Sequence, residues 1–302
     1  MRRITSLFSS VLITAGLAGM VTATTSATTV PIPTVSGSFD QAPRIVFPKV
    51  PAPNSLVVRV LHKGAGPVVH AKDLVVVNYL GEIWRGKVFD SSYSRPLFGV
   101  PIGVHQVIPG WDDGLVGKTV GSRILLVIPP RYGYGAKGQA NVGIKGTDTL
   151  TFVVDVVGDY TKSAHGDLHA TPVTSKIGAV RVSGPLSGAP KITISSGAAQ
   201  PKALSLSMLA RGHGATIRAG LVVLQTVVAN WKGAVQASTW TIGTPDGETI
   251  GQASSPSLLD KLIGQPLGSR FLALIPKSGV SGPYAVVLEV VAQPHGTATQ
   301  PS

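Results

Sequence analysis

The chain has 302 residues, of which 43% are hydrophobic and 13% are charged, and its formal net charge is +12. A chain of this length and apolar content buries the cores of about two domains, which excludes an intrinsically disordered protein. The 36 glycines and 23 prolines favour β-structure with many turns over long solvated helices. The complete lack of cysteine excludes disulfides, thiolate metal sites and a lipid-modified cysteine.

The first 27 residues have the layout of a secretory signal peptide. Arg2 and Arg3 precede the apolar stretch 4–21, and small residues follow to position 27. An uncleaved membrane anchor is the alternative, but the stretch contains serine and threonine and barely reaches the ~20 apolar residues that a span needs. We therefore expect residues 1–27 to be removed and the mature protein to be secreted or associated with the cell envelope.

The positive charge favours electrostatic association with an anionic cell envelope over binding to nucleic acid. Without Arg2 and Arg3 the net charge is still +10, enough to attract anionic surfaces. The sequence contains no run of five basic residues and no basic stripe interleaved with aromatic residues. The histidines His62, His70 and His105 follow no spacing typical of metal ligands, so we expect no metal site.

The second half of the chain repeats the first at an offset of 147 residues. The segment 115–129, LVGKTVGSRILLVIP, matches the segment 262–276, LIGQPLGSRFLALIP. The same offset relates Trp84 to Trp231. A period held over such distances indicates two copies of one supersecondary plan.

The composition along the chain predicts six segments. These are a signal peptide at 1–27, a Pro/Ser/Thr-rich lead at 28–53, a first domain at 54–159, a linker at 160–182, a second domain at 183–294 and a tail at 295–302. The leads of the two copies, the second of which is at 183–202, are either flexible or pair as extra edge strands, and composition does not decide between these alternatives.

Each copy is expected to contain alternating strands and one short helix. Strands are clearest at 74–79 and 221–228. The helices are expected at 111–116 and at 255–264, the second with Ser255 as its cap and Pro256 at its first position. A bent antiparallel sheet packed on one helix in each copy gives an α+β fold with two tandem domains.

Four sequence blocks in the first copy place aromatic residues and one carboxylate in a fixed order. They are VNYLG at 77–81, VFDSS at 88–92, QVIPGW at 106–111 and YGYG at 132–135. A closing strand with Leu150 and Phe152 follows. The order and spacing of the blocks resemble the FKBP-type peptidyl-prolyl cis/trans isomerases. The resemblance implies an isomerase (rotamase) that acts on proline-containing polypeptides in protein folding, needs no cofactor and binds macrolide inhibitors.

The reaction requires a dry aromatic box for the proline ring and a few donors near the twisted imide. Tyr79, Phe89, Trp111 and Phe152 offer large apolar surfaces for such a box. The resemblance implies that Trp111 forms its floor and that Asp90 lies beside the imide. We predict catalytic roles for Tyr79, Asp90, Ile108 (through its backbone N–H) and Tyr134, and substrate binding by Phe89, Phe98, Val107, Trp111, Ile144 and Phe152.

These residues also have structural interpretations. A single Trp or Phe on a strand or short helix is usually a core residue, and Asp90 before two serines is also typical of a turn or of a cap at the start of a helix. The glycines around Tyr134 favour a loop that flexes over a ligand. The chain also departs from the usual family pattern at Val100, Gln139 and 145–146, which we expect to loosen the flap around 139–146.

The second copy lacks the pocket residues. At the offset of 147, Tyr79, Phe89, Asp90 and Trp111 are replaced by Thr226, Gln236, Ala237 and Leu258. Pro129 and Phe152 are 23 residues apart, whereas Pro276 and Val286 are 10 apart, so the flap is missing. We expect a non-catalytic copy that binds partner chains, spaces the active copy or supports stability.

Two further functions remain open from the sequence. The first is a chaperone or peptide-binding protein whose pocket binds without catalysing. The second is a surface-associated structural or adhesive protein, suggested by the positive charge.

Overall fold

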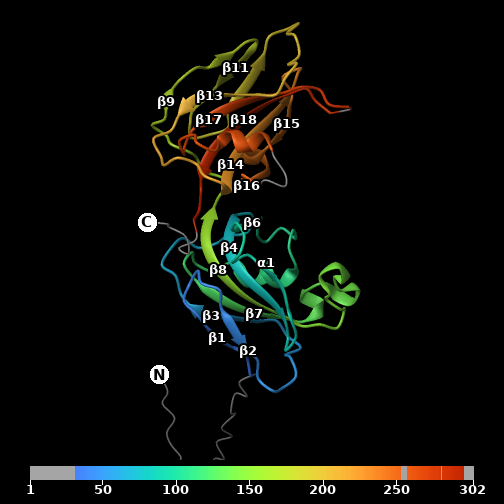
Figure 1. The fold of residues 1–302 in the computed structure, drawn as a ribbon. Coiled ribbons are helices and arrows are strands. Elements are labelled where there is room, and N and C mark those ends of the chain that lie inside the picture. Colours follow the sequence, from blue (N-terminus) through green and yellow to red (C-terminus); the bar gives the residue numbers. More distant parts are fainter. Residues whose placement is uncertain (1–30, 253–256, 280, 296–302) are drawn as a thin grey trace, which may run out of the picture. The chain divides into compact units, whose positions relative to one another are not determined.

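The computed structural model describes residues 31–252, 257–279 and 281–295. The predicted signal peptide at 1–27 and nearly all of the predicted tail lie outside these residues. Residues 32–302 group into one compact unit, and most of its strands are labelled in Figure 1. No helix in the described part of the chain is long and apolar enough to cross a membrane.

The first lead forms a hairpin of two short strands, β1 (Thr34–Ser36) and β2 (Arg44–Val46), which pair with each other. Side chains of the first large sheet bind the turn of this hairpin. Arg123 donates hydrogen bonds to the carbonyl oxygens of Gly37 and Gln41, at 2.6 and 2.7 Å. These bonds satisfy a buried guanidinium and fix the hairpin against the sheet.

The first large sheet is antiparallel with the strand order β3-β7-β8-β4-β5, and β6 also pairs with β4. Its strands are β3 (Val57–His62), β4 (Leu74–Ile83), β5 (Val88–Ser91), β6 (Phe98–Pro101), β7 (Arg123–Ile128) and β8 (Leu150–Tyr160). The predicted strand at 74–79 therefore lies within β4. Strand β7 is buried along its whole length, consistent with the unbroken apolar run of its sequence.

Helix α1 (Pro109–Leu115) packs on one face of this sheet (Figure 1). It begins two residues before the predicted start, because proline fits the first turn of a helix, where its missing N–H is not needed. A Cβ atom at Gly110 or Gly114 would come within 2.7 Å of Ile128 or 2.6 Å of Leu126. The two glycines therefore allow the helix to approach β7 closely.

The second large sheet is also antiparallel, with the order β15-β14-β18-β17-β13-β9, and β16 also pairs with β14. Its strands are β9 (Thr171–Pro172), β13 (Ser205–Arg211), β14 (Gly220–Asn230), β15 (Val235–Ser238), β16 (Asp246–Ile250), β17 (Arg270–Ile275) and β18 (Tyr284–Ala292). A small sheet, β10 (Lys176–Ile177), β11 (Val180–Ser183) and β12 (Lys191–Ile194), contains the start of the second lead.

The six main strands of the two large sheets follow one another in the same spatial order. Their registers also correspond, at the offset of 147 for β7 and β17 but at an offset of 134 for β8 and β18, because the loop before β18 is 13 residues shorter. Leu126 pairs with Phe152 between β7 and β8, and Ala273 pairs with Val286 between β17 and β18. The buried pair Arg123 and Asp155 of the first sheet corresponds to Arg270 and Glu289 of the second.

The segment predicted as a linker is attached to the second sheet. It contains β9 and β10, and the amide of Gln225 donates to the carbonyl oxygens of Lys162 and Ala164 at 3.0 and 2.9 Å. The N–H of Gly166 donates to Glu289 at 2.5 Å. Hydrogen bonds between its backbone and side chains of the second sheet therefore fix this segment, and composition does not reveal such bonds.

The predicted helix at 255–264 differs from the structure. Ser255 and Pro256 lie outside the described residues. The segment contains a 3-10 helix, η4 (Leu258–Leu262), with a capping box between Ser257 and Asp260. A four-residue helix, α2 (Thr239–Ile242), follows β15.

The expected α+β fold with two tandem domains is wrong. The described residues form 18 strands in several sheets and only two α-helices, both short, so the protein is mostly β. The expected division into two domains also fails, because Leu74 and Val76 of β4 pack in one buried cluster with Leu221 and Val223 of β14. Apolar burial across this cluster joins the two large sheets in one compact unit.

Candidate active site

A cavity of about 590 Å³ lies beside helix α1 and the first large sheet. Nine of the ten predicted site residues line it: Tyr79, Phe89, Asp90, Phe98, Val107, Ile108, Trp111, Tyr134 and Phe152. They come from four strands, the start of α1 and the loop after β7. The structure thus brings together side chains that are spread over 74 positions of the sequence, from 79 to 152.

The aromatic side chains form a box around Trp111. Its ring centroid lies 5.3 Å from those of Tyr79 and Phe152, with interplanar angles of 86° to both. The ring of Phe98 lies 5.8 Å from that of Tyr79, also edge-on. Edge-to-face contacts of this kind hold the rings in fixed orientations. Trp111 and Phe152 are buried, whereas Phe98 is 37% exposed and forms the rim.

Gly81 explains how two phenylalanines fit side by side in this box. It pairs with Phe152 across β4 and β8. A Cβ atom at position 81 would approach the ring of Phe89 to 2.7 Å and that of Phe152 to 2.8 Å. The glycine of the VNYLG block therefore leaves space for the wall of the cavity.

Asp90 belongs to a hydrogen-bonded group of three side chains. The hydroxyl of Tyr79 donates to Asp90, and Arg95 Nη2 donates to the hydroxyl oxygen of Tyr79 and to Asp90 Oδ1, both at 2.6 Å. Burial, followed by the nearby Asp90 carboxylate, raises the pKa of Tyr79. Tyr79 therefore stays a hydrogen-bond donor at neutral pH. Asp90 Oδ1 also accepts a hydrogen bond from the N–H of Ser91 at 2.9 Å. Asp90 therefore stabilises the turn and lines the cavity at the same time.

Arg95 was not predicted from the sequence. It lines the cavity, and its guanidinium carbon lies 5.7 Å from the centre of the Tyr79 ring. The available signal was an arginine five residues after Asp90 in a serine-rich turn, because a cation at that distance can fold back on the carboxylate. His105, Gln106, Pro109 and Gly133 are the other lining residues that sequence reasoning missed.

The loop before α1 is positioned by a buried carboxylate. Asp112 accepts hydrogen bonds from the N–H groups of Gly103 and His105 at 2.7 and 2.8 Å. The loop leads to Ile108, which is extended and caps the helix. This arrangement fixes Val107 and Ile108 at the edge of the cavity.

Tyr134 and Ile144 have different positions in the loop between β7 and β8. Tyr134 lies between two short 3-10 turns, is 37% exposed and lines the cavity. Burial and the charge of Asp90 raise its pKa. Ile144 is buried in the core cluster beneath the loop and is not among the lining residues. Its predicted contact with substrate therefore stays a prediction.

The corresponding positions of the second sheet keep the backbone arrangement and differ in chemistry. The N–H of Tyr79 donates to the hydroxyl of Ser92 at 2.8 Å, and the N–H of Thr226 donates to the hydroxyl of Thr239 at 2.8 Å. Thr226 itself donates to Asp246, and Leu258 packs against a hydrophobic core. Neither side chain reproduces the aromatic box.

Comparisons with known proteins identify the family. A family model described as FKBP-type peptidyl-prolyl cis-trans isomerase matches residues 66–157. An FK506-binding protein of Streptomyces anulatus is 38% identical over 122 residues, which cover 39% of this chain and 96% of that protein. The isomerase FkpA of Escherichia coli is 42% identical over 104 residues, which cover 34% of this chain and 37% of that protein. The crystal structure of AtFKBP13 matches 35% of this chain and 94% of that chain, with 32% identity and a TM-score of 0.33.

The chain belongs to the FKBP-type peptidyl-prolyl cis-trans isomerase family. It is an enzyme of that type. The matched residues contain the four sequence blocks and most of the first large sheet, including the cavity just described.

Proposed function

We propose that the cavity beside α1 accelerates cis/trans isomerisation of X-Pro bonds in folding polypeptides by binding the twisted imide more tightly than the planar one. The observation that carries this proposal is the aromatic box around Trp111 with the Tyr79, Asp90 and Arg95 group at its side. The box excludes water from the proline ring, and the polar group supplies fixed charge and donors beside it.

The energetic requirement is modest. Uncatalysed rotation faces a barrier of ~18–20 kcal/mol because amide resonance is lost at the transition state. A turnover of ~10 per second corresponds to about 16 kcal/mol, so the site needs to supply only about 3 to 4 kcal/mol. Differential binding of the transition state reaches this value without a nucleophile or a metal.

Each group has a defined role in this mechanism. Trp111 and the surrounding phenylalanines hold the proline ring. The N–H of Ile108 and the hydroxyl of Tyr134 donate to substrate carbonyl oxygens, and Asp90 lies beside the imide. Tyr79 and Arg95 orient Asp90. No covalent step is involved.

A protease-coupled assay with a short proline peptide tests the proposal. We expect the double variant Asp90→Val, Tyr134→Phe to lower kcat/KM by about ten- to a hundredfold, or about 1.4 to 2.7 kcal/mol. Thr226→Val, at the position equivalent to Tyr79 in the second sheet, serves as the control and should keep full activity. Equal rates for the double variant and the wild type would exclude catalysis in this cavity.

The alternative is a chaperone or peptide-binding protein that uses the same cavity without catalysis. The mostly polar replacements at Thr226, Gln236 and Ala237 favour a non-catalytic role for the second half, such as binding partner chains or supporting stability. Suppression of aggregation separates these roles. A double variant that loses isomerase activity but still suppresses aggregation would assign that function to surfaces outside the cavity.

Export and attachment to the cell envelope are further parts of the proposal. They are supported by the N-terminal sequence and by the net charge of +10 that remains after Arg2 and Arg3 are removed. At about 1 M salt the screening length falls to ~3 Å. Washing cells with such a solution should release the protein, and retention of all of it would exclude attachment by charge.

Binding of a macrolide is proposed from the Streptomyces relative, which is named for binding FK506. The exposed rim at Phe98 and the apolar floor suit a large apolar ligand. Competition between FK506 and the proline peptide is the direct measurement.

A further inference from the structure

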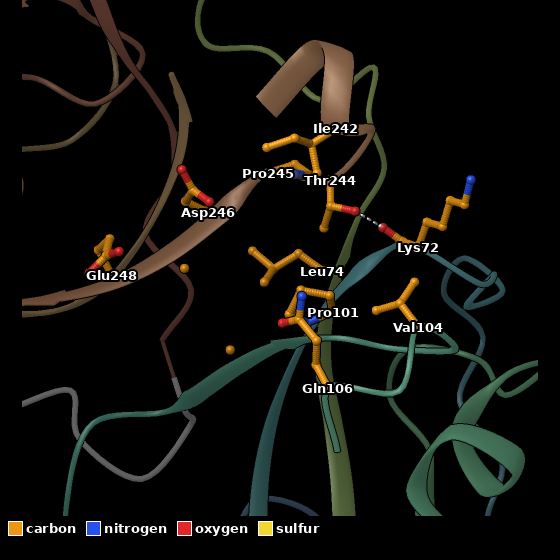
Figure 2. A pocket seen from close by; sticks show the side chains of 12 residues that line it. Lys72, Leu74, Pro101, Val104, Gln106, Ile242, Thr244, Pro245, Asp246 and Glu248 are labelled. Carbon is orange, nitrogen blue, oxygen red and sulfur yellow. Dashed lines mark hydrogen bonds between the residues drawn. The ribbon is translucent and has the colours of Figure 1, made fainter. Parts of the chain in front are cut away.

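A second cavity, of about 380 Å³, lies where strand β6 faces strand β16 (Figure 2). We call it the β6–β16 groove. One side comes from β4, β6 and the loop that follows β6. The other side comes from residues 242–248, which run from the end of α2 into β16. The hydroxyl of Thr244 donates to the carbonyl oxygen of Lys72 at 2.6 Å, which ties the two sides together.

The β6–β16 groove adjoins the proline cavity. Gln106 lines both cavities. Strand β6 separates them, with Phe98 in the proline cavity and Gly99 and Pro101 in the groove, because successive residues of a strand face opposite sides. Gln106 therefore marks the place where the linings of the two cavities meet.

The β16 side of the groove carries two carboxylates without cationic partners. Asp246 and Glu248 are two residues apart on one strand and so lie on the same face. Within residues 31–252, 257–279 and 281–295, neither of them forms an ion pair. Both residues are exposed, and their partial desolvation in the groove raises the pKa of both, with the charge of Asp246 adding to the effect at Glu248. A cation that approaches the two carboxylates offsets the cost of their desolvation.

The remaining lining suits a long aliphatic stem. Leu74, Pro101 and Val104 form an apolar floor, and Ile242 and Pro245 continue it on the opposite side. Lysine and arginine bury their methylene stems on such a surface and keep the charged end near carboxylates. Lys72 extends away from Asp246 and Glu248 in Figure 2, so it leaves the acidic end open to a cation.

We propose that the β6–β16 groove binds the segment of the substrate that flanks the proline, and that Asp246 and Glu248 select a lysine or arginine in that segment. The inference rests on the proposed isomerase function and adds a substrate class to it, namely proline-containing chains with a nearby basic residue. The polypeptide side chain that fits is basic, because the charges at the β16 end of the groove are the carboxylates of Asp246 and Glu248.

The position of the basic residue is set by the reach of an extended chain. A strand advances about 3.3 Å per residue, so residues two to six positions from the proline lie roughly 7 to 20 Å from it. Both directions along the substrate need to be sampled.

The test uses the full-length protein and fluorescence-quenched proline peptides with two lysines, two glutamines or two glutamates at these positions. One series carries them before the proline and one after it. In one series the lysine peptide should have a KM about three- to tenfold lower than the glutamine peptide, the range for a partly exposed ion pair. The preference should shrink as salt is raised.

The variant Asp246→Asn, Glu248→Gln should remove the lysine preference and leave kcat/KM for a short proline peptide unchanged. The matched control Glu82→Gln, Asp113→Asn makes the same change in net charge outside the groove and should keep the preference. Equal KM values for lysine and glutamine peptides with the wild type, or a preference that survives in the groove variant, would overturn the inference. If the wild-type protein does not isomerise the short proline peptide, the proposed function itself is refuted.

Discussion

Arg95 shows how a single side chain completes the polar wall of the proline cavity. It donates to both Tyr79 and Asp90, and without it the carboxylate depends on the Tyr79 hydroxyl and the Ser91 N–H for its orientation. Arg95 is therefore a positioning residue, since its hydrogen bonds go to the groups proposed to face the substrate.

Replacing Arg95 by alanine should lower kcat/KM by about three- to tenfold, which corresponds to about 0.7 to 1.4 kcal/mol. We expect the loss mainly in kcat, because the aromatic box that binds the proline ring stays intact. Arg95→Lys keeps the charge and should recover part of the loss. An alanine variant with wild-type kcat would show that Arg95 has no positioning role.

Asp159 is a residue-scale source of pH dependence. It lies at the end of β8, and burial raises its pKa to about 7, with a further contribution from the neighbouring Asp73 and an opposing one from His70. Its Oδ1 atom is buried without a hydrogen-bond partner among the described residues. Between about pH 4 and pH 7 the folded protein therefore holds a proton on Asp159 that the unfolded chain, with the ordinary pKa of 3.8, releases.

Because the pKa is raised on folding, stability should fall as the pH rises from about 4 to about 7. Asp159→Asn removes the ionisation. We expect it to raise the free energy of unfolding relative to wild type by about 1 to 2 kcal/mol at pH ~8, with little change at pH ~4, after allowance for solvent screening. Urea unfolding at both pH values measures this, with Asp113→Asn as the control. A difference independent of pH would contradict the assignment.

At the scale of elements, the hairpin β1–β2 depends on the ion pair between Arg123 and Asp155. The side chains are 4% and 0% exposed, and Arg123 also binds the hairpin backbone. The N–H of Asp40, in the hairpin turn, donates to Asp155 at 2.7 Å. The two side chains that form the ion pair also attach the hairpin to the sheet, so loss of the ion pair should weaken the attachment.

Arg123→Met should lower the free energy of unfolding by about 3 to 5 kcal/mol, because it leaves a buried carboxylate without its cation. The double variant Arg123→Met, Asp155→Leu should be less destabilised than the single one. Hydrogen exchange at residues 34–46 should become faster in both variants. Unchanged exchange there would show that other contacts hold the hairpin.

At the scale of the whole molecule, the two large sheets share a buried apolar cluster. Gly99 of β6 and Gly247 of β16 lie next to each other, because a Cβ atom on either would be in van der Waals contact with the other strand, at 3.6 and 3.5 Å. The cluster of Leu74, Val76, Leu221 and Val223 lies beside them. Unfolding should therefore be a single cooperative transition.

Leu221→Ala should lower stability by about 2 to 4 kcal/mol, and Leu221→Asp, which buries a charge in the cluster, should split calorimetric unfolding into two transitions. Leu262→Ala, within the core of the second sheet, is the matched control: it should cost a similar amount and keep one transition. A single transition for Leu221→Asp would show that the cluster does not couple the sheets.

The sequence by itself determined the family, nine of the ten lining residues predicted for the cavity, the central strands at 74–79 and 221–228, and the offset of 147 that relates β4 and β7 to β14 and β17. These features depend on local order and spacing, which the chain carries directly. Only the tertiary structure decided that the two copies form one compact unit, that both leads pair as strands, that Arg95 joins Asp90, and that β6 and β16 enclose a groove. Such contacts join residues far apart in the chain, and the burial that stabilises them leaves no periodic signal in the sequence.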